Sequence, residues 1–139
     1  MGTEAAPRSG PLANTRVIEM GTMIAGPFCG QLFADHGAEV IKLEQPEVGD
    51  PMRQWGKEKP HGKALFWPVL ARNKLSATLN AREDDGQLLV KKLVEGADVL
   101  LENFRPGTME KWGLGFEELS AINPKLVMIR VSGFGQTGP

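Results

Sequence analysis

Residues 16–50, RVIEMGTMIAGPFCGQLFADHGAEVIKLEQPEVGD, contain the pattern from which the fold class is inferred. The apolar run 16–20 predicts a strand that stops at Gly21, and the run 40–43 predicts a second strand. Between them, apolar residues recur at the spacing of a helix that packs one face inward. A strand, a helix and a strand so close together indicate a βαβ unit, whose two strands are parallel neighbours.

The predicted helix has recognisable ends and one apolar stripe. Pro27 lies near its start, where a missing N–H costs least. Gly37 suits the left-handed residue that ends a helix, and His36 before it is expected to interact with the helix dipole. The residues expected to face the interior are Ala25, Phe28, Cys29, Leu32 and Phe33.

The rest of the chain continues the alternation of strands and helices. Strands are predicted at 73–80, 98–102 and 126–131, and helices at 84–95, at 116–122 and in a short segment ending at Gly113. Residues 45–68 contain turn residues and three aromatic rings without periodicity, which predicts a long irregular loop of the kind that is usually functional or mobile. The alternation predicts an open, doubly wound α/β layer with a mostly parallel sheet.

Composition limits the possible functions. The 139 residues are 41% apolar and 24% charged with a net charge of −1, which favours one globular domain, or part of one, and gives no reason to expect a nucleic-acid partner. No apolar run approaches the roughly 20 residues that span a bilayer, so no membrane segment is expected.

Residues 1–14 are expected to form a disordered tail. The single cysteine, Cys29, excludes a disulfide within the chain, is expected to be a small buried hydrophobe, and fits a cytoplasmic protein. His36 and His61 lie far apart, so no metal site is expected.

One hypothesis is a dinucleotide-binding module. Gly21, Gly26 and Gly30 cluster near the first turn, and Glu44 follows the second strand where an acid that binds ribose is found in such folds. The glycine spacing is not GxGxxG, however, and Pro27 removes an amide from the helix terminus that holds a pyrophosphate. The simpler interpretation is that the glycines permit turns and close packing. A module binding NAD or another nucleotide remains the alternative of another class.

Basic and amide side chains recur near the predicted strand ends. Singly, each is the charge expected of any soluble surface. Together they suit the phosphates of a nucleotide-like ligand, because arginine forks match phosphate oxygens. These residues are Arg53, Arg82, Asn103, Arg105 and Lys111.

A collinear series of motifs runs from Arg16 to the last residue. It consists of AGP at 25–27, GAEVIKLE at 37–44, GD at 49–50, NK at 73–74, ADVLLENF at 97–104, MEKWGLG at 109–115, NP at 123–124 and SGFGQTGP at 132–139. This series resembles the N-terminal part of the class III CoA-transferase (CaiB/BaiF) family.

The resemblance implies a Rossmann-like α/β large domain, left incomplete over residues 15–139, a smaller second domain, and a homodimer with interlocked subunits. It also implies that acyl-CoA and a carboxylic acid acceptor are the substrates. Relative to formyl-CoA transferases, Gln45 and Lys111 replace arginines, Ser132 replaces a lysine and Ile24 replaces a glutamine near the acyl group, so formate and oxalate are not the expected substrates. The resemblance also implies that the turn beginning at Ala25 lies close to the thioester. The positions that match the family's CoA contacts are Ile24, Ala25, Gln45, Leu79, Asn80, Ala81, Arg82, Asn103, Phe104, Arg105 and Lys111.

The family's transferases use an aspartate that attacks the acyl-CoA thioester and forms first a mixed anhydride and then an enzyme-bound thioester. The resemblance places that aspartate beyond Pro139, so no residue of this chain is expected to be catalytic and the chain is expected to be an N-terminal fragment. A 2-methylacyl-CoA racemase, which shares this half of the fold, is the alternative within the family.

Overall fold

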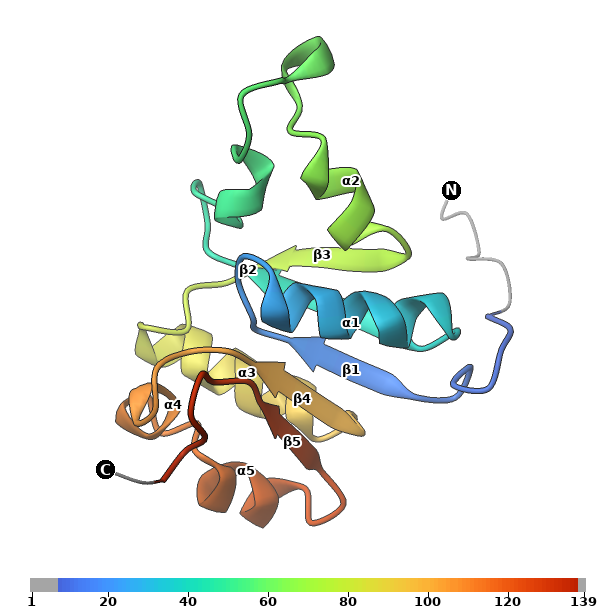
Figure 1. Ribbon diagram of the computed structural model, residues 1–139. Coiled ribbons are helices and arrows are strands. Elements are labelled where there is room, and N and C mark those ends of the chain that lie inside the picture. Colours follow the sequence, from blue (N-terminus) through green and yellow to red (C-terminus); the bar gives the residue numbers. More distant parts are fainter. Residues whose placement is uncertain (1–7, 138–139) are drawn as a thin grey trace.

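The computed structural model describes residues 8–137, which form a parallel sheet with helices on both faces (Figure 1). The strand order is β3-β2-β1-β4-β5, and all four neighbouring pairs are parallel. The predicted α/β class with a Rossmann-like parallel sheet is therefore confirmed. The strands are β1 (Arg16–Glu19), β2 (Glu39–Glu44), β3 (Lys74–Thr78), β4 (Val99–Glu102) and β5 (Val127–Arg130).

The chain winds outward from β1 in two directions, first through β2 to β3 and then through β4 to β5. The strand order therefore reverses beside β1, and doubly wound sheets hold their ligands at such a point, beyond the carboxyl ends of the strands. The helices that connect the strands are α1 (Ala25–Asp35), α2 (Phe66–Ala71), α3 (Asp84–Val94), α4 (Thr108–Lys111) and α5 (Phe116–Ile122), with 3-10 turns η1 (Pro51–Arg53) and η2 (Pro60–Gly62).

Two buried clusters lie on opposite faces of the sheet, because successive residues of a strand point to opposite sides. Val17 and Leu101 belong to the cluster under α1, whereas their neighbours Ile18 and Leu100 belong to the cluster under α3 and α5. All four side chains are fully or almost fully buried. The continuous apolar character of β1 and β4 thus follows from burial on both faces.

The apolar stripe predicted for α1 is confirmed for Cys29 and Phe33, which pack against a buried cluster, and wrong for Ala25, Phe28 and Leu32, which are exposed. Phe28 and Leu32 are 49% and 45% exposed, and the face that packs on the sheet instead carries small residues with Pro27 and Gln31. At Gly30 a Cβ would overlap Glu19 Oε2 and lie 2.8 Å from Glu19 Cδ, so the helix approaches too closely for a large side chain. The predicted helix end is confirmed, since α1 stops at Asp35 and is followed at position 37 by a glycine with φ of 98°.

Residues 51–71 form an arm that extends past the edge strand β3 (Figure 1). The sequence predicted no regular structure before Pro68, but α2 begins at Phe66 and lies against α1. The arm is held by its aromatic residues: Trp55 stacks on Phe66 with ring centroids 5.6 Å apart, and the Arg53 guanidinium lies 3.8 Å from the Trp67 ring centroid. Six residues including a proline are too few for a periodic signal, which explains why α2 was missed.

The predicted tail at residues 1–14 falls partly outside the described residues, which start at Arg8. Residues 8–14 lie against the end of α1. The Leu12 amide donates to the His36 carbonyl at 3.0 Å, and Arg8 Nη1 donates to the Ala38 carbonyl at 3.0 Å. The boundary between tail and domain at residue 15 stays a prediction. Within residues 8–137, none of the helices has the length and apolar character needed to cross a membrane.

Candidate functional site

A cavity of about 360 Å³ opens at the carboxyl edge of the sheet, beside the reversal of strand order. Loops from four strands surround it, as expected for a ligand site in this class of fold. The residues lining it are Met20 and Thr22 after β1, the β2 end and exit at 42–45 and 48–51, the β3 exit at 79–82, and Phe104 and Trp112 after β4.

The cavity brings together six of the eleven residues expected to contact CoA, namely Gln45, Leu79, Asn80, Ala81, Arg82 and Phe104. The other five are Ile24, Ala25, Asn103, Arg105 and Lys111, which do not line it. Ile24 and Ala25 are exposed at the start of α1, and Arg105 and Lys111 are exposed in the segment after β4. These four side chains point to solvent around the site, while Asn103 has a role within the protein.

The side chain of Asn103 fastens the turn after β1. The Thr22 amide donates to Asn103 Oδ1 at 2.8 Å, and Asn103 Nδ2 donates to the Thr22 carbonyl at 3.0 Å. A Cβ on Gly21 or Gly26 would lie 2.9 or 3.0 Å from the same Oδ1, and within 3.0 Å of the other glycine's Cα. These two glycines therefore permit close packing of the turn, which supports the simpler of the two interpretations made from the sequence.

The walls of the cavity differ in character. Phe104 and Trp112 form an apolar wall, with ring centroids 5.1 Å apart in an edge-to-face arrangement. The β3 exit adds polar groups to the lining, because it includes Asn80 and the exposed Arg82. Asn80 Oδ1 accepts from the Arg82 amide at 3.2 Å, which fixes the turn that presents the arginine. A lining that contains both an apolar wall and a cation suits a ligand that carries both a ring or alkyl chain and phosphates.

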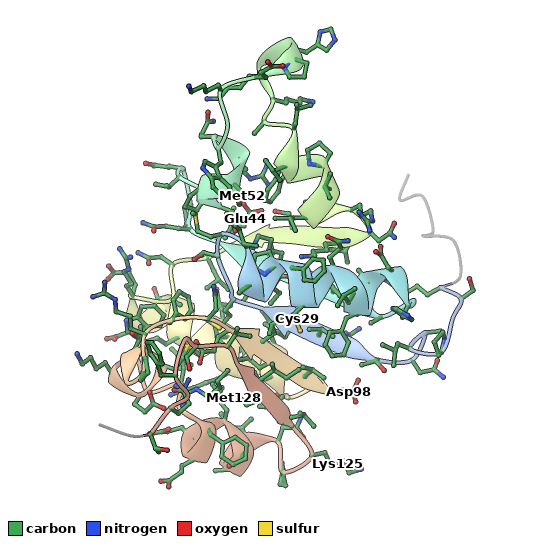
Figure 2. All side chains as sticks on the ribbon, viewed as in Figure 1. Cys29, Glu44, Met52, Asp98, Lys125 and Met128 are labelled. Carbon is green, nitrogen blue, oxygen red and sulfur yellow. The ribbon has the colours of Figure 1, made fainter. Side chains whose placement is uncertain are left out.

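Glu44 lies at the end of β2 and at the base of the arm, near Met52 (Figure 2). Arg53 binds its carboxylate through Nε and Nη2, both at 2.7 Å, and Ser76 Oγ donates to it at 2.6 Å. The Asp50 amide donates to it as well, at 2.9 Å. Burial raises the pKa of Glu44, but these hydrogen bonds outweigh burial and lower the pKa to about 2. The hypothesis that Glu44 binds a ribose is wrong, because its oxygens are already occupied.

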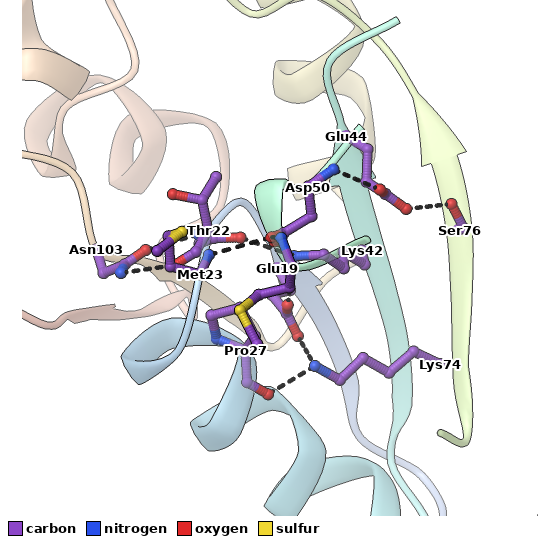
Figure 3. A network of polar contacts seen from close by, with 12 residues as sticks. Glu19, Thr22, Met23, Pro27, Lys42, Glu44, Asp50, Lys74, Ser76 and Asn103 are labelled. Atoms are coloured by element: carbon purple, nitrogen blue, oxygen red, sulfur yellow. Dashed lines mark hydrogen bonds and ion pairs between the residues drawn. The ribbon is translucent and has the colours of Figure 1, made fainter. Parts of the chain in front are cut away.

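Beneath the turn after β1, four charged side chains form a buried group (Figure 3). Glu19 and Lys42 are paired residues of β1 and β2, and Lys42 Nζ donates to Glu19 Oε1 at 3.0 Å and to the Gly21 carbonyl at 2.8 Å. Lys74 Nζ lies 2.6 Å from Glu19 Oε2 and donates to the Pro27 carbonyl at 2.6 Å. Burial lowers the pKa of Lys74, and the Glu19 carboxylate opposes that change.

The fourth member, Asp50, extends this group to the cavity. Its Oδ2 lies 2.8 Å from Lys42 Nζ, an ion pair whose angles depart from hydrogen-bond geometry. Its Oδ1 accepts from the Met52 amide at 2.8 Å and from the Met23 amide at 3.3 Å. Sequence reasoning missed this group. The signal that was available is a pair of opposite charges, Glu19 and Lys42, each of which interrupts a run of apolar residues.

A second charged group supports the other side of the site. Arg130 of β5 donates from Nε to Glu102 Oε1 at 2.7 Å and from Nη1 to Glu110 Oε1 at 2.6 Å. Glu102 Oε2 accepts from the Phe104 amide at 2.6 Å. Arg130 therefore connects β4, α4 and the loop that presents Phe104 to the cavity.

Cys29 is half-buried on α1 rather than fully buried, and burial, followed by the nearby Glu19 charge, raises the pKa of its thiol. A raised pKa reduces the thiolate fraction, so the side chain is poorly suited to be a nucleophile. In residues 8–137, no group of three or more His, Cys, Asp or Glu side chains is placed to hold a metal ion.

Comparison with known proteins gives consistent matches. A family model described as CoA-transferase family III matches residues 12–139. The succinyl-CoA–D-citramalate CoA-transferase of Chloroflexus aurantiacus is 63% identical over 139 residues, covering 100% of this chain and 34% of that protein. The beta subunit of the succinyl-CoA–L-malate CoA-transferase of the same organism is 52% identical over 129 residues, covering 93% and 32%.

A solved structure shares the fold as well. The crystal structure of a CaiB/BaiF family protein from Brucella suis superposes with a TM-score of 0.86 at 43% identity, covering 94% of this chain and 35% of that one. The chain spans about a third of the length of each of these proteins.

Proposed function

Since the chain belongs to CoA-transferase family III, we propose that the full-length protein moves CoA from an acyl-CoA to a carboxylic acid. The observation that carries the proposal is the cavity at the carboxyl edge of the sheet. Six residues that the family resemblance assigns to CoA contact line one space there, although they come from three separate segments of the chain. Residues that lie far apart in the sequence thus meet in one cavity. This supports the proposal that the protein binds CoA and does not merely share the fold of proteins that do.

The proposed substrates follow from the relatives. The names of two of them pair succinyl-CoA with D-citramalate and with L-malate. We therefore propose succinyl-CoA, or a similar dicarboxylic acyl-CoA, as the donor and a hydroxydicarboxylic acid as the acceptor. The relatives are named as transferases, which favours this reaction over the racemase alternative.

The walls of the cavity suggest how CoA is held. The Phe104–Trp112 wall and Leu79 offer apolar surface to the adenine ring or the pantetheine chain, and Arg82 offers a guanidinium to the phosphates. Lys111, Arg105 and the start of α1 at Ile24–Ala25 would act from outside the cavity, on parts of CoA that extend beyond it.

The residues that line the cavity supply binding, and we propose that the nucleophile comes from elsewhere in the full-length protein. Asp50 is the aspartate among the lining residues of the described part of the chain. Its Oδ1 accepts from two backbone amides, and its Oδ2 forms an ion pair with Lys42. A carboxylate neutralised in this way is a poor nucleophile. We therefore propose an aspartate beyond residue 139 that forms the anhydride and thioester intermediates.

We also propose that the full-length protein is a cytoplasmic homodimer with interlocked subunits, as the family resemblance implies. The exposed apolar side chains of α1 and α2 support a covered surface in the complete protein. They include Phe28, Leu32, Phe66 and Val69.

The test of the function is direct assay of the full-length protein. Succinyl-CoA is incubated with D-citramalate, L-malate or glutarate, and new acyl-CoA products are separated by chromatography and identified by mass. Arg82→Met is expected to raise the Kd of CoA, whereas Lys92→Met, which removes an exposed charge from α3, is expected to leave it unchanged. If the parent protein forms no new acyl-CoA and binds no CoA, the proposal is wrong.

A further inference from the structure

We propose that Glu19, Lys42 and Asp50, three members of the buried ion group, are a positioning device, which holds the turn at Thr22–Met23 in a strained conformation against the CoA cavity. The inference rests on the proposed function, and it assigns roles to residues of the cavity wall that are almost fully buried and act on the substrate through the turn. Lys42 and Asp50 are therefore positioning residues.

The burial of these charges is the first argument. Glu19, Lys42 and Asp50 are 0%, 2% and 2% exposed. Moving charges out of water is costly, and apolar side chains of similar volume often give equal or greater stability at such positions. A gain in stability therefore does not explain well why three charged residues occupy these buried positions. A requirement to hold the surrounding backbone in one conformation explains it better.

The contacts of Lys42 show which geometry is held. Its ammonium reaches Glu19 in β1, the Gly21 carbonyl just after β1, and Asp50 in the loop after β2. One side chain thus connects the exits of two neighbouring strands on the edge of the sheet where the cavity lies. Thr22, Lys42 and Asp50 all belong to the cavity wall.

The backbone at Met23 is the second argument. Met23 has φ of 65°, in the left-handed region that a residue with a side chain adopts only at an energetic cost. Such strain persists where the surroundings impose it, and it is concentrated at functional sites. Here Asp50 Oδ1 accepts from the Met23 amide at 3.3 Å and Asn103 binds the preceding residue, so the turn is held from both sides.

The strained turn lies next to the residues expected to contact the substrate. Thr22 contributes to the cavity wall, and Ile24–Ala25, the predicted contacts near the acyl group of the substrate, follow directly. The expected contacts of the CoA body lie instead on the β3 exit and at Phe104. Loss of the ion group should therefore misplace the acyl group while leaving the affinity for free CoA largely intact.

The test compares Lys42→Met and Asp50→Asn with the control Arg72→Met in the full-length protein. Arg72 also forms an ion pair with α1, through Asp35, but at the opposite end of the helix from the turn. Calorimetry gives the Kd of free CoA, and the transfer assay with succinyl-CoA gives kcat and KM. Thermal unfolding identifies any variant that does not fold.

In both Lys42→Met and Asp50→Asn we expect kcat to fall by about tenfold or more, because misplacement of reacting groups by about 1 Å has effects of that size. The Kd of free CoA is expected to stay within about twofold, a change of less than ~0.5 kcal/mol, because Lys42 and Asp50 are each only 2% exposed and offer almost no surface to a ligand. Arg72→Met is expected to match the parent in both quantities. If Lys42→Met does not fold, Asp50→Asn decides, because it keeps the volume of the side chain and an oxygen for the two amides.

Two results would overturn the inference alone: a kcat close to the parent value in the folded variants, or an equal loss of free-CoA affinity and kcat, which would indicate a general loss of structure. A parent protein that binds no CoA would overturn the proposed function, and this inference with it.

Discussion

Asn103 binds both backbone polar groups of Thr22, accepting from its amide at 2.8 Å and donating to its carbonyl at 3.0 Å. The two residues are 81 positions apart, in the loops that follow β4 and β1. Because β1 and β4 are neighbours where the strand order reverses, this amide fixes the distance between the two halves of the sheet at the ligand edge. Asn103 was expected to contact CoA, which stays a prediction, and the structure shows that its side chain also holds the turn after β1.

Asn103→Ala is expected to lower the free energy of unfolding by about 1–3 kcal/mol, since it leaves the Thr22 polar groups without partners. It is also expected to reduce CoA transfer, because the turn lines the cavity. Chemical denaturation and the transfer assay measure the two effects. The matched control is Asn123→Ala, which removes an amide that donates to the Val94 and Ala97 carbonyls away from the cavity. The control should lose stability without a specific loss of transfer; equal losses of transfer in the two variants would contradict the role given to Asn103.

Gly30→Ala is expected to destabilise the protein by about 1–3 kcal/mol, as overpacking does, because the new methyl would overlap the Glu19 carboxylate. Ordinarily the same change in a helix stabilises by up to about 1 kcal/mol. Gly96→Ala provides the comparison, since its Cβ would meet the flexible Arg16 side chain at 3.4 Å. Thermal unfolding should show a lower Tm for Gly30→Ala alone. A stabilised Gly30→Ala protein would show that α1 does not lie so close to β1.

Glu44→Gln is expected to change the acid limb of the stability curve. The hydrogen bonds to Glu44 lower its pKa to about 2 from an ordinary value of 4.5. The ionised carboxylate therefore contributes stability that is fully present above pH 4.5 and is lost as the pH falls toward 2. Denaturant titrations between these pH values should show a shallower loss of stability in Glu44→Gln than in the parent. Parallel curves of stability against pH for the two proteins would mean that protonation of Glu44 does not cause the loss of stability in acid.

Lys111→Ala is expected to weaken CoA binding by about two- to fivefold at low ionic strength, as an exposed ion pair with a phosphate would. The difference should shrink toward 1 M salt, where the Debye length is only about 3 Å. Lys125→Ala, an exposed charge before β5, is the control. Calorimetric titrations at two salt concentrations measure both. A Kd that Lys111→Ala leaves unchanged at low salt would remove this residue from the site, in agreement with its position outside the cavity.

Much of the fold could be predicted because buried parallel strands leave a strong local signal. The runs around Val17, Val40 and Leu100 are apolar on both faces and end at glycine, proline or charged residues. It was harder to predict which face of each helix is buried. In α1 the large residues Phe28 and Leu32 point outward and the glycines inward, because the spacing between helix and sheet is set by a contact with Glu19 that periodicity does not record.

The site was predictable only in part, for a related reason. The family resemblance assigned residues such as Leu79, Arg82 and Phe104 to the site by their positions along the chain. They line one cavity because they follow strands whose carboxyl ends meet at one edge of the sheet. The ion group of Lys42 and Asp50 depends on contacts between separate segments. In the sequence, this ion group was indicated only by Glu19 and Lys42, two charges that interrupt runs of apolar residues.

Calorimetric titration of the full-length protein with CoA, and separately with NAD, tests the central claim most directly. We expect saturable CoA binding that Arg82→Met weakens, and no heat of binding with NAD, because Glu44 is occupied and the turn after β1 is closely packed. Binding of NAD without binding of CoA would contradict the account.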